Sequence, residues 1–246
     1  MHQQYIERVV DLTEPEANQI YGLPVEEAKE IVLHGSAEAV GRIAGSFALV
    51  AREGKTVKMV RSLDRPLRYF LAKRQEGPVL IVAARIDAIY QWLKMEGLEG
   101  QFHPGYTRMV PAHYVVTLQL IGCPDPDPVY TRFFTPPQGG MSADLDQIGA
   151  AYIGALADEL ACWLPAVPAR EPIGVCFSGG IDSGSVFLTT YHVILKLGMN
   201  PSRLKAFVLD VGDGPDVGQA RVFLDSLGLG LFLEPIAADE IGRAHV

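Results

Sequence analysis

The most informative part of the chain is Ile173-Gly-Val-Cys-Phe-Ser-Gly-Gly-Ile-Asp-Ser183. It opens on apolar or small residues, which favour a strand buried on both faces. Two glycines follow, and then apolar residues recur at helical spacing as far as Leu197. The pattern predicts a strand, a tight glycine turn and a helix. The backbone N–H groups of such a turn, together with the helix N-terminus, favour an anion and above all a phosphate.

Each polar or small residue of the turn suits a phosphate ligand. Gly179 and Gly180 have no Cβ, which lets a phosphate approach the backbone closely. Ser178 and Ser183 supply hydroxyl donors, and Asp182 is a candidate ligand for a Mg²⁺ that neutralises the phosphates. No lysine follows the glycines, so the turn is not the Gly-x-x-x-x-Gly-Lys-Ser/Thr loop. A glycine-rich turn with no ligand is the alternative, and the strand–turn–helix setting favours nucleotide binding over it.

The composition bounds the class of protein. The chain has 246 residues, 48% hydrophobic and 20% charged, which is typical of a globular protein with one large or two modest domains. Its net charge of −8, without a local basic stripe, disfavours a nucleic-acid partner. The scattered cysteines, with no signal peptide or long apolar span, predict a reduced, cytoplasmic protein with no membrane partner. No Cys/His spacing suggests zinc.

The pattern along residues 1–138 predicts an α+β domain with an antiparallel sheet. Short β-prone segments bounded by Gly-containing turns indicate a meander. The expected elements are a strand at 5–10, helices at 24–34 and 37–43, four meander strands at 46–52, 56–61, 68–74 and 79–84, a helix capped by Asp87 and ended by Gly97, and a strand at 114–120.

The pattern along residues 139–246 predicts a parallel sheet. A long amphipathic helix at 142–164 leads into the strand at 173–177. Beyond the helix after the turn, a buried strand at 204–209, a helix at 216–227 and a third strand at 230–233 follow. Alternating strands and helices favour parallel pairing. We therefore expect a domain boundary near residue 138.

Ser178-Gly-Gly-Ile-Asp-Ser183 resembles the pyrophosphate loop of the N-type ATP pyrophosphatases, in the form used by asparagine synthetases. Further segments match that family in order: Gly45–Ala48, Arg61–Phe70, Ala83–Ala88 and His103–Gly105 in its N-terminal glutaminase-type domain, and the helix from Ser142, Ala206–Leu209 and Gly214–Leu227 in its synthetase domain. The resemblance implies an incomplete Ntn-hydrolase-like α+β domain at 1–138. It also implies a three-layer α/β ATP pyrophosphatase domain, incomplete at its C-terminus, at 139–246.

The chain departs from the family at both ends. The family's glutaminase nucleophile is an N-terminal Cys that its own α-amino group activates, whereas Met1 is followed here by His2. No Asn-Gly-Glu segment is present, and the family's Arg-Asp pair is Arg61-Ser62, so no glutaminase residue is assigned and no glutamine hydrolysis is expected. The family's Ser-Gly-x-Gly-x-Asp-Glu segment is also missing. Glu240–Val246 resembles translated sequencing adapter, and we expect an artificial end that leaves apolar sheet surface exposed.

The resemblance implies an ATP-dependent amide-forming ligase, with ATP and Mg²⁺ as cofactors. ATP would adenylate a carboxylate with release of pyrophosphate, and an amine would attack the acyl-adenylate. A glycine loop with Mg²⁺ and hydroxyl donors stabilises the charge that develops on the phosphates. The implied ATP contacts are Ser178, Gly179, Gly180, Ile181, Asp182 and Ser183, with Asp182 also on the metal and with Cys176 and Leu209 near the adenine.

Several alternatives stay open. The nitrogen donor is ammonia or an amine, the carboxylate belongs to a small molecule or a peptide, and the oligomeric state is undetermined. Relatives with a degenerate N-terminal domain include β-lactam-forming synthetases and lasso-peptide cyclases. A non-catalytic nucleotide-binding remnant is the alternative from another class. A tRNA-thiolating or lysidine-forming enzyme shares the loop, but the acidic charge and the lack of a Cys-x-x-Cys pair disfavour it.

Some residues near the loop have two interpretations. Plain strand core explains Cys176 and Leu209 as well as adenine contact does. Asp210, Asp213 and Asp216 follow a strand at the expected carboxyl end of the sheet, where ligands bind in open α/β sheets. Turn and cap chemistry is the alternative for Asp213 and Asp216.

Overall fold

The computed structural model describes residue 6 and residues 8–74, 76–121, 127–210 and 214–237. The chain divides into two compact units, residues 1–138 and 139–246, and the division falls between Gln138 and Gly139. The described residues form helices together with parallel and antiparallel sheets, which confirms the expected mixed α/β class.

The first unit contains two four-stranded sheets among its described residues. One has the order β1-β7-β6-β8 and the other the order β10-β9-β5-β4. The bounds are β1 Arg8–Asp11, β4 Ala48–Glu53, β5 Thr56–Arg61, β6 Arg68–Ala72, β7 Val79–Ala83, β8 Arg108–Met109, β9 Tyr114–Gln119 and β10 Val129–Arg132, with a small pair β2 Gln19–Ile20 and β3 Gly45–Ser46. The helices are α1 Val25–His34, α2 Ala37–Gly41 and α3 Ile86–Met95, and short 3-10 turns include η2 Glu99–Gln101 and η3 Pro104–Tyr106.

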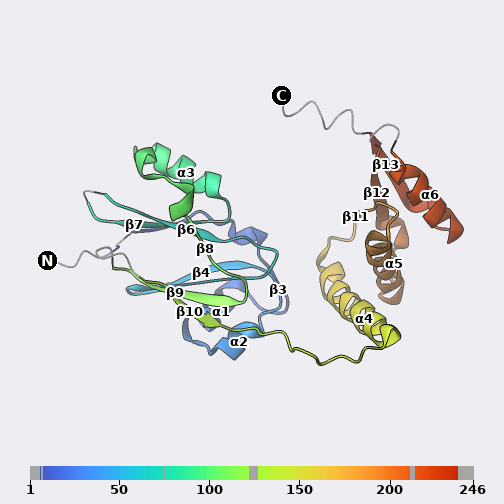
Figure 1. The fold of residues 1–246 in the computed structure, drawn as a ribbon, viewed down its shortest axis with the longest axis horizontal. Coiled ribbons are helices and arrows are strands. Elements are labelled where there is room, and N and C mark those ends of the chain that lie inside the picture. The colour runs from blue at the N-terminus through green and yellow to red at the C-terminus, as the bar shows by residue number, and fades with distance from the viewer. Residues whose placement is uncertain (1–5, 7, 75, 122–126, 211–213, 238–246) are drawn as a thin grey trace. The chain divides into compact units, whose positions relative to one another are not determined.

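These elements stack in four layers, with α3 against one sheet and α1 and α2 against the other (Figure 1). Alternation along the strands explains the layering, because successive side chains point to opposite faces. In β6, Tyr69 contributes to the core between the sheets, and Phe70 contributes to the core under α3. Each sheet is thus buried on both faces by apolar side chains.

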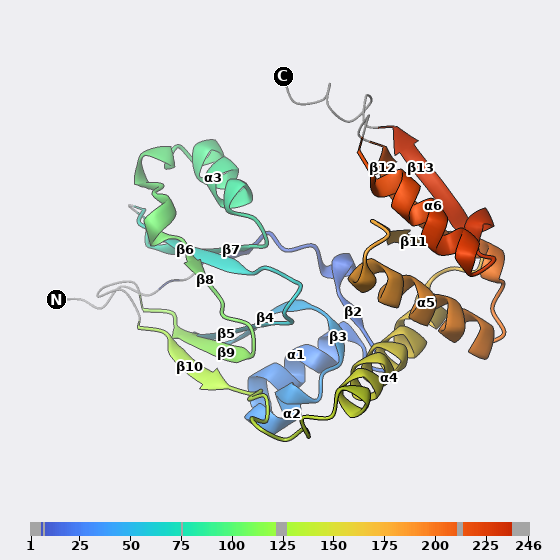
Figure 2. The ribbon, with the colours of Figure 1, turned by 45° about the vertical axis from the view of Figure 1, so that its right-hand side comes forward.

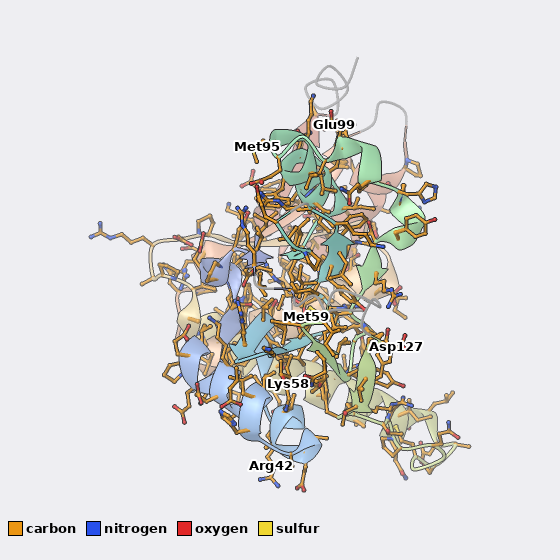
Figure 3. All side chains as sticks on the ribbon, turned by 90° about the vertical axis from the view of Figure 1, so that its left-hand side faces the viewer. Arg42, Lys58, Met59, Met95, Glu99 and Asp127 are labelled. Carbon is orange, nitrogen blue, oxygen red and sulfur yellow. The ribbon has the colours of Figure 1, made fainter. Side chains whose placement is uncertain are left out.

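Lys58 and Met59 in β5 show how one strand serves two layers (Figure 3). Met59 is fully buried between the sheets. Lys58 points to the other face, where its ammonium donates to the carbonyl of Leu33 in α1 at 2.7 Å. The lysine therefore caps the C-terminal end of α1, where a cation is favoured.

The predicted single meander is wrong. β4 pairs with β5 in one sheet and β6 pairs with β7 in the other, so the chain crosses between sheets after β5. Strands that follow one another about every ten residues can form one meander or two stacked hairpins. The difference is that strands of stacked sheets carry apolar side chains on both faces. β1, at residues 8–11, joins β7 in parallel and so overlaps residues 8–10 of the predicted 5–10 strand, whose Tyr5 lies outside the described residues.

Asp87 is not the cap of α3. The helix begins at Ile86, and Asp87 lies in its first turn, where its carboxylate accepts from the Arg85 guanidinium at 2.9 Å. An acidic side chain in the first turn still complements the helix dipole. The buried face of α3 consists of Ile89, Trp92 and Leu93, at the spacing of an amphipathic helix.

The second unit has a three-stranded parallel sheet of order β11-β12-β13, which confirms the predicted parallel pairing. Its elements are α4 Leu145–Trp163, β11 Ile173–Cys176, α5 Ile181–Lys196, β12 Leu204–Asp210, α6 Asp216–Ser226 and β13 Leu233–Ala237. α4 packs on α5, and α6 packs on β12 and β13 (Figure 2). Asp144 is the N-cap of α4, because its carboxylate accepts from the N–H groups of Asp146 and Gln147.

The strand at 173–177 is not buried on both faces. Ile173 and Val175 are buried against α5 and α6, whereas Gly174 and Cys176 on the opposite face are exposed. Leu209 of β12 is also exposed. The described residues of this unit therefore form two layers and not the expected three, because both crossover helices cover the same face of the sheet.

The predicted third strand at 230–233 is displaced along the chain. Gly230–Phe232 forms a 3-10 turn, and the strand begins at Leu233. Phe232 is buried with its ring 5.5 Å from the ring of Tyr191, centroid to centroid. The run Leu-Gly-Leu-Phe-Leu is apolar throughout, so its composition does not separate the turn from the strand.

Candidate functional site

The loop between β11 and α5 is built as the sequence predicts, with a strand, a glycine turn and a helix. β11 ends at Cys176, residues 177–180 turn, and Ile181, Asp182 and Ser183 form the first turn of α5. The loop therefore lies at the carboxyl end of the parallel strands. Ligands of open α/β sheets bind at this edge.

Gly179 is the residue that the shape of the loop requires. Its φ is +77°, in the left-handed region that favours glycine. A Cβ at this position would also lie 2.8 Å from the backbone nitrogen of Ala220 in α6. Gly180 has an ordinary φ of −81°, and a Cβ there would meet only the Ser178 hydroxyl at 3.4 Å. The fold thus needs the first glycine, and the second matters only through the room that it leaves for a ligand.

The two predicted serines hold the loop together. Ser183 Oγ accepts from the Ser178 N–H at 3.2 Å and donates to the Gly180 carbonyl at 3.2 Å. The two hydroxyl oxygens are also 3.2 Å apart, and Ser178 Oγ accepts from the Gly180 N–H at 3.4 Å. This network fixes the turn and gathers two hydroxyl groups beside the start of α5.

Several backbone donors remain available at the loop. The N–H groups of Gly179, Ile181, Asp182 and Ser183 donate no hydrogen bond to any acceptor in the described part of the chain. Donors at the start of a helix carry a partial positive charge of about half an elementary charge. The loop can therefore accept an anion through its backbone alone.

A mainly apolar pocket of about 330 Å³ opens next to the loop. It brings together three of the predicted residues, Cys176, Ser178 and Leu209. Phe207, Ile236 and Asp216 also line it, and the sequence alone does not assign Phe207 or Ile236 to the site. Parallel register places Leu209 opposite Ile236, and only knowledge of the strand pairing reveals that neighbour. An aromatic and aliphatic wall beside free backbone donors suits a heterocyclic base next to its phosphates.

The predicted aspartates fall in different places. Asp182 is exposed in the first turn of α5, and Asp210 is the exposed last residue of β12. Asp216 lines the pocket and is the first residue of α6, whose N-cap is Pro215, so the cap interpretation of Asp216 is wrong. Asp213 lies outside the described residues.

The donor set fits a metal carried by phosphates better than a metal held by the protein alone. No group of three or more His, Cys, Asp or Glu side chains in the described ranges could hold a metal ion. Mg²⁺ commonly binds through one or two carboxylates together with substrate phosphates. Asp182 at the loop matches that pattern. None of the side chains that line the pocket in the described structure is a lysine or an arginine.

No protein-family model matches this chain, and no curated protein matches it in sequence. None of the described helices is both long enough and apolar enough to cross a membrane.

Proposed function

We propose that the second unit binds Mg-ATP and that the chain acts as an ATP-dependent amide-forming ligase of the asparagine synthetase type. The observation that carries the proposal is the loop at residues 178–183 beside the Cys176–Leu209 pocket. Free N–H groups and two hydroxyls gather at the loop, a donor set that suits a phosphate, and an apolar wall adjoins it. The sequence resemblance in the loop points to the same ligand.

In the proposed complex, the pyrophosphate end of ATP lies against the N-terminus of α5. The N–H groups of Gly179, Ile181 and Asp182 donate to its oxygens, and the Ser178 and Ser183 hydroxyls rotate from their partners in the loop to donate as well. The adenine lies between Cys176 and Leu209. Asp182 would hold a Mg²⁺ that arrives with the phosphates, and this metal would supply positive charge, which the described pocket lining lacks.

Adenylation places negative charge on the leaving pyrophosphate, and donors already oriented by the loop stabilise that charge. The carboxylate oxygen attacks the α-phosphorus, pyrophosphate leaves, and an amine displaces AMP from the acyl carbon. The amine is ammonia or belongs to the substrate, as in a cyclising synthetase, and the carboxylate belongs to a small molecule or a peptide.

A second candidate is nucleotide binding without catalysis. The absence of lysine and arginine from the described pocket lining favours it, because adenylation requires positive charge near the leaving phosphates. Equilibrium binding of Mg-ATP tests both candidates together. Exchange of labelled pyrophosphate into ATP, measured with amino-acid and peptide carboxylates, then separates them. Binding with exchange supports the ligase, binding without exchange supports the second candidate, and no binding contradicts both.

A further inference from the structure

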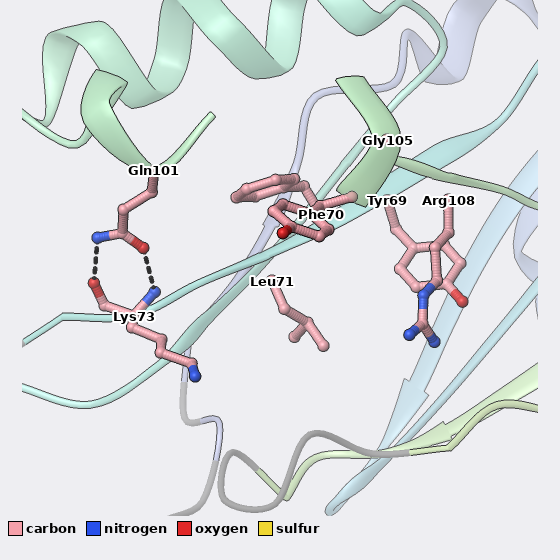
Figure 4. A pocket seen from close by; sticks show the side chains of 8 residues that line it. Tyr69, Phe70, Leu71, Lys73, Gln101, Gly105 and Arg108 are labelled. Atoms are coloured by element: carbon pink, nitrogen blue, oxygen red, sulfur yellow. Dashed lines mark hydrogen bonds between the residues drawn. The ribbon is translucent and has the colours of Figure 1, made fainter. Parts of the chain in front are cut away.

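A second pocket lies in the first unit, along the free edge of β6. It has a volume of about 350 Å³ and is lined by residues of β6, η2, η3 and β8 (Figure 4). Its polar groups come from Lys73, Gln101 and Arg108, and its apolar wall from Phe70 and Leu71. The phosphate loop belongs to the other unit, so this pocket is independent of the function proposed above.

The strand edge in this pocket has an unfilled position. Backbone groups of alternate residues point to the same edge of a strand, so those of Tyr69, Leu71 and Lys73 face one way. Tyr69 is paired with Arg108 of β8. Lys73 is paired with the side-chain amide of Gln101, which accepts from its N–H at 2.8 Å and donates to its carbonyl at 2.6 Å (Figure 4). Leu71 lies between Tyr69 and Lys73. On that edge, its N–H and C=O form no hydrogen bond with any described residue.

Gln101 shows what chemistry this edge accepts. A planar amide, which donates one hydrogen bond and accepts another, already replaces a strand at Lys73. The next position along the edge, Leu71, offers the same donor and acceptor pair. A ligand amide or peptide group fits there for the same reason, as in recognition by strand addition.

Positive charge lies next to the open position. Arg108 and Lys73 line the pocket, and neither forms an ion pair with another described residue. Arg108 neighbours Tyr69, a side chain that is only 1% exposed. Arg108 itself is exposed, so its guanidinium is available to an anionic ligand.

We propose that this pocket binds a carboxylate that is followed by an amide, as found at the C-terminal residue of a peptide or in an N-acyl amino acid. The amide pairs with the backbone of Leu71, and the carboxylate accepts from the Arg108 guanidinium. Arginine suits this role because its planar fork binds a carboxylate through two parallel hydrogen bonds. The ligand side chain lies against Leu71.

The test uses the full chain and a fluorescein-labelled tripeptide Gly-Ala-Leu, with fluorescence anisotropy as the readout. We expect binding of the free acid and at least tenfold weaker binding of the C-terminal amide, since the amide lacks the charge that strengthens the hydrogen bonds to Arg108. Arg108→Gln should weaken binding by a similar factor. The matched control is Arg42→Gln, which removes an exposed guanidinium that is paired with Glu38 and lies outside the pocket, and it should leave binding unchanged.

Two further measurements keep the proposal open to contradiction. The amide hydrogen of Leu71 should exchange more slowly when the peptide is bound, a readout that needs no variant. Competition by N-acetyl-leucine as effective as that by the unlabelled tripeptide would assign the ligand to N-acyl amino acids, and much weaker competition would assign it to peptide ends. Equal binding of acid and amide, unchanged Leu71 exchange, or equal effects of Arg108→Gln and Arg42→Gln would overturn the proposal.

Discussion

The backbone of Gly179 lies so close to Ala220 that a Cβ on Gly179 would come within 2.8 Å of the Ala220 nitrogen. This contact joins the glycine loop between β11 and α5 to α6, the helix that begins with Asp216 at the apolar pocket. Packing against α6 therefore helps to shape the loop. Both this packing and the positive φ require glycine at position 179.

Gly179→Ala should therefore destabilise the second unit and remove nucleotide binding. The φ of +77° costs an alanine about 1 kcal/mol, and displacement of α6 adds to that cost. The matched control is Gly198→Ala, with a φ of +65° but open space around its Cβ, which should cost stability without changing binding. Thermal unfolding and Mg-ATP titration of both variants provide the comparison. If both bind Mg-ATP like the wild type, the loop is not the nucleotide site.

Ser183→Ala should weaken nucleotide binding more than it weakens the fold. The hydroxyl bonds Ser178 and Gly180, and each such bond contributes about 0.5–1.5 kcal/mol to stability. Loss of the network also frees the Ser178 hydroxyl, so we expect Mg-ATP affinity to fall about tenfold. Ser185→Ala is the control, because its hydroxyl only donates to the Ile181 carbonyl within the same helix. Isothermal titration should separate the two variants, and equal affinities would count against the role given to Ser183.

Tyr69→Phe should change how stability depends on alkaline pH. Burial raises the pKa of Tyr69 to about 12, although Arg108 acts in the opposite direction. A tyrosine with a raised folded pKa contributes stability that is complete below its unfolded pKa, near 10, and is lost as pH rises toward 12. The wild type should therefore lose more stability than Tyr69→Phe above pH 10. Urea unfolding between about pH 8 and pH 11 measures the difference, and parallel curves would contradict the prediction.

Asp64→Asn should reduce the loss of stability in acid. Burial by itself raises the pKa of Asp64, but hydrogen bonds from the Ser46 and Ser62 hydroxyls outweigh it, so the folded pKa is lowered. A carboxylate with a lowered folded pKa stabilises the fold fully above its unfolded pKa, near 4. This stabilisation is lost as the pH falls through the folded pKa. The variant should unfold less steeply with acid. In Ser62→Ala, NMR titration should show a higher pKa for the Asp64 carboxyl, and no change would contradict the hydrogen-bond account.

The order of most elements could be predicted from apolar periodicity and turn residues, because these are local signals. β11, α5 and β12 follow from the run at 173–209, and the amphipathic spacing of α3 identifies its buried face. The division of the strands between two sheets depends on long-range pairing, which a ten-residue spacing does not encode. The predicted position of β13 is wrong for a related reason. Phe232 is buried by contacts with Tyr191, and the apolar run does not specify those contacts.

The candidate site divides in the same way. The glycines and serines of the loop are adjacent in sequence, so their chemistry could be predicted directly. Phe207 and Ile236 reach the pocket only through parallel register between β11, β12 and β13. The open position at Leu71 depends on the short length of β8, which leaves that edge of β6 unpaired.

The most direct test of nucleotide binding compares two cysteines in one molecule. Cys176 and Cys162 are both free and exposed, but only Cys176 lines the pocket beside the loop. Alkylation by iodoacetamide, followed by peptide mass spectrometry, gives the rate at each. With saturating Mg-ATP we predict that Cys176 reacts at least fivefold more slowly while Cys162 is unchanged, and that Gly179→Ala abolishes this protection. Equal rates at Cys176 with and without Mg-ATP would contradict nucleotide binding at this site.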